Sequence, residues 1–138
     1  MSKSIGRKFS MAMVVDRKLM DWPEDALASL GAYREVDDGW TLETTVADGT
    51  ETSWVAVSPP RDDLEELEHE ERRFVNKQIA KPIRYGVWGR GYTALDRFLR
   101  TCPHPLSVCL FSSDAPSISL EEALRVKQEG IDWLWVDK

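Results

Sequence analysis

The sequence predicts a single α/β domain, residues 1–138, in which helices pack on a mixed sheet. Three observations indicate this fold class: a hairpin pattern in the first half, a charged helical stretch in the middle, and alternating strand and helix patterns in the second half. The expected parts are therefore residues 1–60, 61–81 and 82–138. A chain of 138 residues is long enough to bury one hydrophobic core.

The first part opens with a strand and a short helix. Residues 8–16 read KFSMAMVVD, an apolar alternation that favours a strand with one well-buried face. The basic residues before it give a signal-peptide outline, but the apolar run is too short and Asp16 ends it. Asp21 then predicts a helix cap, with Pro23 in the first turn and Gly31 after the last. We expect a cytoplasmic protein.

The hairpin pattern occupies residues 40–57. Two β-rich segments flank an Asp-Gly pair at 48–49, which favours the type I′ turn of a tight hairpin. A two-residue turn would place Leu42 opposite Val55 on the face that meets the core. The other face of the hairpin is mostly polar, although it also carries Trp54.

A long charged helix is expected over residues 62–80, before Pro82. Seven of the ten residues from 62 to 71 are acidic, and the basic residues come later in the segment. This gradient complements the helix macrodipole and so can serve helix stability alone. The same acidic run could also form a face for a basic partner.

The last part predicts a β-α-β-α-β unit. Strands are expected at 83–88, 106–111 and 131–136, with helices at 94–101 and from the capping box at Ser119 to Gly130. Consecutive βαβ units imply parallel strands joined by right-handed crossovers. The expected sheet therefore combines a parallel half with the antiparallel hairpin.

A weak ligand site is predicted at the carboxyl edge of the parallel strands, where open α/β sheets bind ligands. Arg90 could clamp an anion, and the free N–H groups at the start of the next helix would favour it. The glycines at 86, 89 and 91 match no phosphate-binding fingerprint, and a tight turn would also explain them. The candidate residues are Arg90, Gly91, Thr93, Ser112 and Asp114.

The sequence shows no assembled catalytic set, which favours a protein-binding module over an enzyme. The net charge of −6 argues against nucleic acid as a partner, although residues 72–100 hold eight basic residues and one acid. We expect a protein partner that is itself basic, masked by this module in the manner of an inhibitor or immunity protein. The candidate partner-binding residues are Glu65, Glu66, Glu68, Glu70, Trp54 and Trp88. The alternative is a phosphate or nucleotide site at the carboxyl edge, with or without catalysis.

No metal or cofactor site is predicted, and no catalytic residue is assigned. Cys102, His104 and Cys109 form at most part of a zinc set, because a fourth ligand is missing and Cys109 falls inside an expected strand. We therefore expect both cysteines to be reduced, structural thiols.

Overall fold

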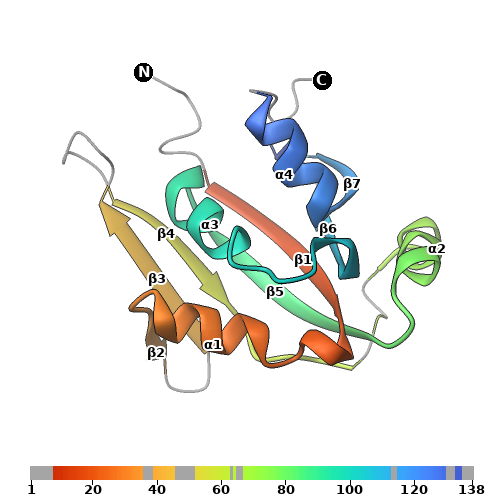
Figure 1. Cartoon of the computed structure of the whole chain (residues 1–138), viewed down its shortest axis with the longest axis horizontal. Coiled ribbons are helices and arrows are strands. Elements are labelled where there is room, and N and C mark those ends of the chain that lie inside the picture. Colours follow the sequence, from red (N-terminus) through yellow and green to blue (C-terminus); the bar gives the residue numbers. More distant parts are fainter. Residues whose placement is uncertain are drawn as a thin grey trace.

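The computed structural model describes residues 8–35, 39–45, 52–62, 64, 67–112, 115–129 and 133–134. Within these residues, seven strands form one antiparallel sheet with helices beside it (Figure 1). The strands are β1 (Lys8–Asp16), β2 (Tyr33–Glu35), β3 (Gly39–Thr45), β4 (Thr52–Val57), β5 (Pro82–Arg90), β6 (Val108–Ser112) and β7 (Ala115–Ser119). The α-helices are α1 (Trp22–Ser29), α2 (His69–Gln78), α3 (Tyr92–Leu99) and α4 (Leu120–Gln128), and 3-10 turns follow β1 at Arg17–Leu19 and precede β6 at Pro105–Ser107.

The strand order is β2-β3-β4-β5-β1-β6-β7, so the first strand lies inside the sheet. β1 is apolar on both faces: Met13 and Val15 belong to one core cluster, and Val14 belongs to the other. A strand that is apolar on both sides is stable only where both faces are covered. This explains why β1 takes a central position between β5 and β6.

The predicted parallel unit is wrong, because β1 separates the two strands that were expected to be neighbours. β5 and β6 do run in the same direction, but each pairs antiparallel with β1. Helix α3 connects them across β1. The α/β class with a mixed helix and strand content holds, whereas every described strand pair is antiparallel.

The hairpin prediction is confirmed in register. Leu42 pairs with Val55 in the β3–β4 ladder, and both side chains are buried in the main core. The Asp-Gly turn at 48–49 lies outside the described residues. Two strands, β2 and β7, were not predicted: both are short and lie at the two edges of the sheet.

The long charged helix starts later than expected, at His69. A helix from residue 62 would have stacked like-charged carboxylates one turn apart, which is destabilising. Instead, Glu71 accepts a hydrogen bond from the backbone N–H of Glu68 at 2.9 Å and closes the first turn. Leu64 and Leu67 precede the helix, and the latter is buried against the second core cluster.

The end of the chain also departs from its prediction. Trp133 and Leu134 lie in a bend rather than a strand, and the rest of the expected strand 131–136 lies outside the described residues. Both side chains are buried in the main core, whereas consecutive residues of a strand would point to opposite faces of the sheet. Tyr92 explains the placement, because its hydroxyl accepts a hydrogen bond from the N–H of Leu134 at 3.1 Å.

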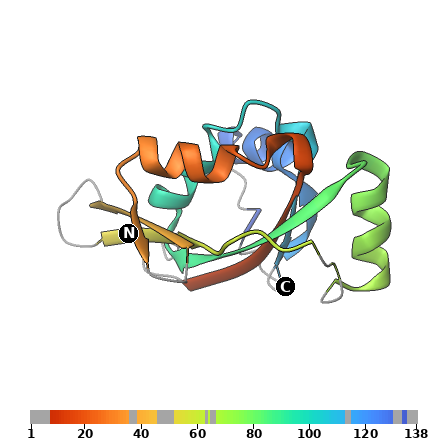
Figure 2. The same ribbon diagram turned by 90° about the horizontal axis from the view of Figure 1, so that it is seen from below.

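Two hydrophobic layers result from this arrangement. Helices α1, α3 and α4 cover one face of the sheet, as the edge-on view shows (Figure 2). Helix α2 packs on the other face, over β1 and β6, where Phe74 meets Phe111 edge to face. Helix α1 is held to α3 by Trp22, which stacks on Phe98 at a centroid distance of 5.0 Å and donates a hydrogen bond to Thr101. This contact places the start of α1 above the ends of β3, β4 and β5.

Candidate binding site

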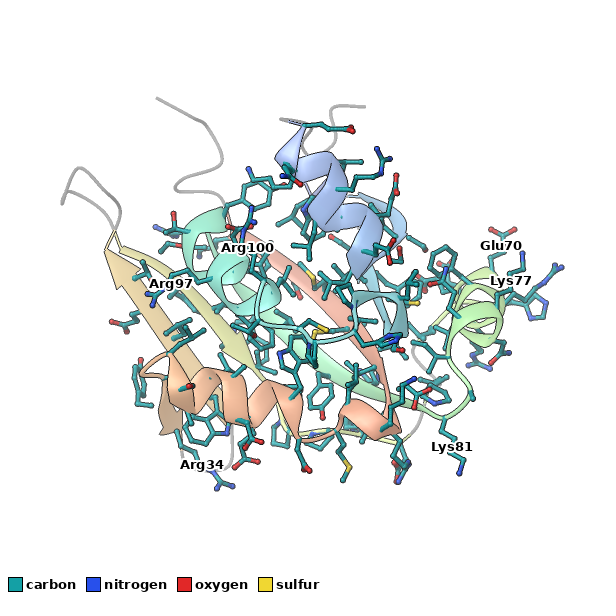
Figure 3. The ribbon with its side chains drawn as sticks, viewed as in Figure 1. Arg34, Glu70, Lys77, Lys81, Arg97 and Arg100 are labelled. Atoms are coloured by element: carbon teal, nitrogen blue, oxygen red, sulfur yellow. The ribbon has the colours of Figure 1, made fainter. Side chains whose placement is uncertain are left out.

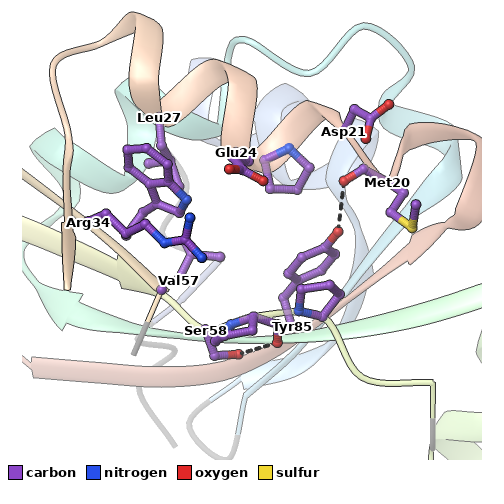
Figure 4. A pocket seen from close by; sticks show the side chains of 13 residues that line it. Met20, Asp21, Glu24, Leu27, Arg34, Val57, Ser58 and Tyr85 are labelled. Carbon is purple, nitrogen blue, oxygen red and sulfur yellow. Dashed lines mark hydrogen bonds between the residues drawn. The ribbon is translucent and has the colours of Figure 1, made fainter. Parts of the chain in front are cut away.

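A cavity lies between the start of α1 and the sheet (Figure 4). Its volume is about 220 Å³. Pockets that enclose a whole drug-sized ligand start at about 300 Å³. The cavity therefore suits one amino-acid side chain better than a nucleotide. Its lining comes from five separate parts of the chain: residues 20–27, Arg34, residues 39–40, residues 57–60 and Tyr85.

The walls of the cavity are mainly aromatic and proline side chains. Trp40 and Tyr85 contribute rings, and Pro23, Pro59 and Pro60 contribute rigid apolar surface. Tyr85 is 3% exposed, and its hydroxyl donates a hydrogen bond of 3.0 Å to the backbone carbonyl of Met20. This bond ties β5 to the turn before α1 and so holds two sides of the cavity together.

The floor of the cavity depends on an irregular end of β4. After Val57, the N–H of Ser58 donates to the carbonyl of Gly86 at 2.9 Å, and the hydroxyl of Ser58 accepts from the N–H of Gly86 at 2.7 Å. The next two residues are prolines, which cannot donate a ladder hydrogen bond. The chain pairs with β5 again at Arg61, which leaves the prolines free to line the cavity.

Two carboxylates and one guanidinium set the charge of the cavity. Asp21 and Glu24 belong to the start of α1, and Arg34 reaches in from β2 (Figure 4). Among the described residues, none of these three side chains takes part in an ion pair or a side-chain hydrogen bond. Burial, followed by the negative charge of the two carboxylates, raises the pKa of Tyr85 to about 12. The carboxylate end of the cavity thus disfavours a further negative charge.

The sequence analysis identified the residues that line the cavity only as parts of helices and strands. Asp21 and Pro23 indicated the start of a helix, and Trp40 indicated a strand end. Glu24, Arg34 and Tyr85 were not singled out as site residues. No local spacing could have grouped them, because they come together only when α1 folds back over β3, β4 and β5.

The predicted carboxyl-edge residues are only partly brought together. Arg90 ends β5 and pairs with Lys8, whereas Ser112 ends β6 and pairs with Met11. With β1 between them and three residues of offset, their backbones are about 14 Å apart on standard strand spacings. Asp114 lies outside the described residues.

At this edge of the sheet, a side chain of the protein itself binds the first turn of helix α3. Helix α3 begins at Tyr92, with Gly91 at a φ of 74° before it, and Thr93 is exposed in the first turn. The hydroxyl of Ser53, which is fully buried, accepts from the N–H of Ala94 at 3.0 Å and donates to the carbonyl of Arg90 at 2.8 Å. This intramolecular cap occupies one of the N–H groups that an anion would need.

One of the glycines in this stretch has a structural reason. Gly89 lies inside β5 rather than in a loop, and a Cβ atom there would come within 2.1 Å of the carbonyl oxygen of Trp54. Glycine thus allows the backbones of β4 and β5 to approach.

The described members of the predicted partner-binding set lie on different elements. Glu68 and Glu70 are exposed at the start of α2, and Glu65 and Glu66 lie outside the described residues. Trp54 and Trp88 are half-buried on β4 and β5, on the face opposite to α1 and α3. Helix α2 packs on the same face of the sheet, but over β1 and β6, so Glu68 and Glu70 lie over other strands than the two tryptophans (Figure 1).

The basic segment 72–100 is likewise divided by the fold. Lys77 lies on α2, and Lys81 lies just before β5 (Figure 3). Arg97 and Arg100 lie on α3, well away from them in the same view. Arg84 is buried. The linear charge cluster therefore does not form one positive surface.

The cysteines and histidines do not form a metal site in the described part of the chain. Cys102 and Cys109 are free thiols in different core clusters, on opposite faces of the sheet. Burial raises the pKa of both, that of Cys109 to about 12. No three His, Cys, Asp or Glu side chains among the described residues gather closely enough to hold a metal ion. None of the described helices has the length and apolar character needed to cross a membrane.

Comparisons with protein-family models, with curated protein sequences and with solved structures yield no match for this chain.

Proposed function

We propose that this protein is an acidic binding module that masks a basic protein partner, as an inhibitor or immunity-type protein does. The observation that carries the proposal is the pair of carboxylates at the cavity, Asp21 and Glu24, which have no cationic partner among the described residues. Some acids elsewhere are paired, such as Asp62 with Arg17 and Asp96 with Arg100, and Asp21 and Glu24 differ from other unpaired acids by their place at the cavity. Charges left unpaired beside aromatic walls suit a cation supplied by another molecule.

The predicted acidic run remains a second possible contact of the same partner. Glu68 and Glu70 are exposed at the start of α2 and could add to the negative field that a basic protein meets on approach. Their local role in helix α2 is sufficient to explain them. The cavity therefore carries more of the proposal than the acidic run does.

The alternative, a phosphate or nucleotide site at the carboxyl edge, has less support. Arg90 is exposed there, but Ser53 caps the adjacent helix and Ser112 is two strands away. The phosphate-site alternative predicts that a phosphate-bearing ligand raises the melting temperature of the protein and that Arg90→Ala abolishes this rise. A broad nucleotide and sugar-phosphate screen without a shift in melting temperature would reject this alternative.

The module proposal is tested by capture of partners on three immobilised forms of the full chain. These are the native protein, an Asp21→Asn/Glu24→Gln variant, and an Asp25→Asn/Glu121→Gln control that removes two exposed carboxylates outside the cavity. We expect a stoichiometric basic protein on the native and control forms, with an association rate at least about tenfold lower on the cavity variant and a steep dependence on salt.

Two further measurements complete this test. A Glu68→Lys/Glu70→Lys variant shows whether the acidic run contributes to the same association rate. Equal capture by the native form and the cavity variant, or a partner without net positive charge, would refute the proposal.

A further inference from the structure

We propose that the cavity binds a single arginine or lysine side chain of the partner, which inserts between Trp40 and Tyr85 and places its charged end by Asp21 and Glu24. This inference rests on the proposed function and adds the chemical class of the group that the cavity takes. It also assigns a competing role to Arg34, the cation that the protein itself places there.

The shape of the cavity matches a long side chain with a polar end. Leu27, Val57 and the three prolines supply apolar surface along the cavity, which suits the methylene stem of arginine or lysine. A volume of about 220 Å³ accepts one such side chain and excludes a folded segment. Shallow apolar contact alone would not select a cation, so the polar groups decide the specificity.

The polar groups of the cavity favour a positive charge at one end. Asp21 and Glu24 lie above the cavity on the side of α1, close enough to Tyr85 to act on its ionisation (Figure 4). Carboxylates that accept hydrogen bonds from a guanidinium or ammonium group form the stronger, charge-assisted class of hydrogen bond. The face of an aromatic ring adds a further attraction for the same cation.

Arg34 lies at the end of the cavity away from Asp21, with Glu24 between the two, and points into the cavity (Figure 4). It forms no ion pair with Asp21, Glu24 or any other described residue. Its charge therefore lowers the negative potential of the site without filling the carboxylate end. A cation entering from a partner is repelled by Arg34, so removal of this charge should strengthen binding.

The test uses small probes that carry only the side-chain charge. N-acetyl-arginine methylamide and N-acetyl-lysine methylamide are titrated into the native protein, with N-acetyl-glutamine methylamide as the uncharged probe. Binding is followed by NMR at the indole of Trp40 and the ring of Tyr85. We expect the two cationic probes to shift these signals and the uncharged probe to leave them unchanged.

The variants make the outcome independent of folding damage. Asp21→Asn/Glu24→Gln should weaken binding of the cationic probes by at least about tenfold, since each charge-assisted hydrogen bond contributes substantially. Arg34→Gln should tighten it by about threefold or more through loss of repulsion, a gain that misfolding cannot mimic. Asp25→Asn, which changes the same helix outside the cavity, should leave it unchanged.

Three results would overturn the inference: equal binding of the uncharged probe, signal changes elsewhere than at the cavity, or Arg34→Gln binding no tighter than the native protein. Loss of partner capture in the Asp21→Asn/Glu24→Gln variant, without any binding of the probes, would leave the module proposal standing and reject the single-side-chain site. Binding of the probes without any basic partner would do the reverse.

Discussion

Tyr85 joins the two sides of the cavity and responds to the charge around it. Its hydroxyl donates to Met20, its ring lines the cavity, and burial followed by Asp21 and Glu24 raises its pKa to about 12. The neutral phenol is therefore the form that the folded protein favours. Deprotonation would place a third negative charge beside two carboxylates.

The raised pKa of Tyr85 predicts a loss of stability at alkaline pH. The folded protein keeps the phenol proton at pH values where the unfolded chain, with a pKa near 10, has lost it. The stability contributed by Tyr85 is thus fully present below about pH 10 and is lost as pH rises to about 12. Ultraviolet titration of tyrosinate absorbance should show a late component that disappears in Tyr85→Phe. A native titration curve identical to that of the variant would contradict this prediction.

At the scale of single residues, the sequence predicted the chemical state of a side chain better than its hydrogen-bond partners. The reduced state expected of Cys102 and Cys109 agrees with the two free, buried thiols. Asp21 was predicted as a helix cap and does precede α1, but its side chain makes no capping hydrogen bond and instead borders the cavity. A carboxylate at a helix start serves either purpose, and only its three-dimensional neighbours distinguish them.

Helix α3 shows how one element depends on a distant strand. Its sequence signal, Gly91 to Thr93, is local, whereas its cap is the hydroxyl of Ser53 in β4. Ser53 is fully buried and makes two hydrogen bonds, to Ala94 and to Arg90. No motif in the sequence could indicate this pairing, because it requires β4 to lie beside the end of β5.

Ser53→Ala should therefore destabilise the fold. The substitution removes the partner of the buried N–H of Ala94 and of the partly buried carbonyl of Arg90, at a cost of about 1–3 kcal/mol. Urea denaturation measures the loss, with Ser10→Ala as the control because Ser10 is an exposed serine of β1 and its replacement should change stability by less than about 0.5 kcal/mol. Equal stability of the two variants would show that the cap is not needed.

Element positions were predicted well wherever the signal was local. The strand at 8–16, the hairpin register and the helix from Ser119 were predicted, and Ser119 does accept the expected hydrogen bond from the N–H of Glu122. Helix α2 starts later than predicted, at His69, and like-charged carboxylates one turn apart disfavour an earlier start. The short edge strands β2 and β7 were missed because their pairing depends on a neighbour rather than on their own pattern.

For the whole molecule, the central place of β1 predicts a gradient of amide protection. β1 has a partner on each side, and its ladder with β5 runs the full length from Lys8 to Asp16. β2 and β7 are edge strands with one partner each in the described sheet. Native-state hydrogen exchange should be slowest in β1 and β5 and fastest in β2 and β7. Exchange in β1 as fast as in β2 would contradict the strand order.

The sequence by itself determined the class of the fold, most element positions and the unequal distribution of charge, because these follow from local propensity, hydrophobic period and composition. The tertiary structure decided which strands are neighbours: β1, apolar on both faces, separates β5 from β6 and converts an expected parallel unit into an antiparallel sheet. It also decided the candidate site. Asp21, Glu24, Arg34 and Tyr85 meet because the packing of Trp22 on Phe98 and the hydrogen bond from Tyr85 to Met20 hold the start of α1 over the sheet.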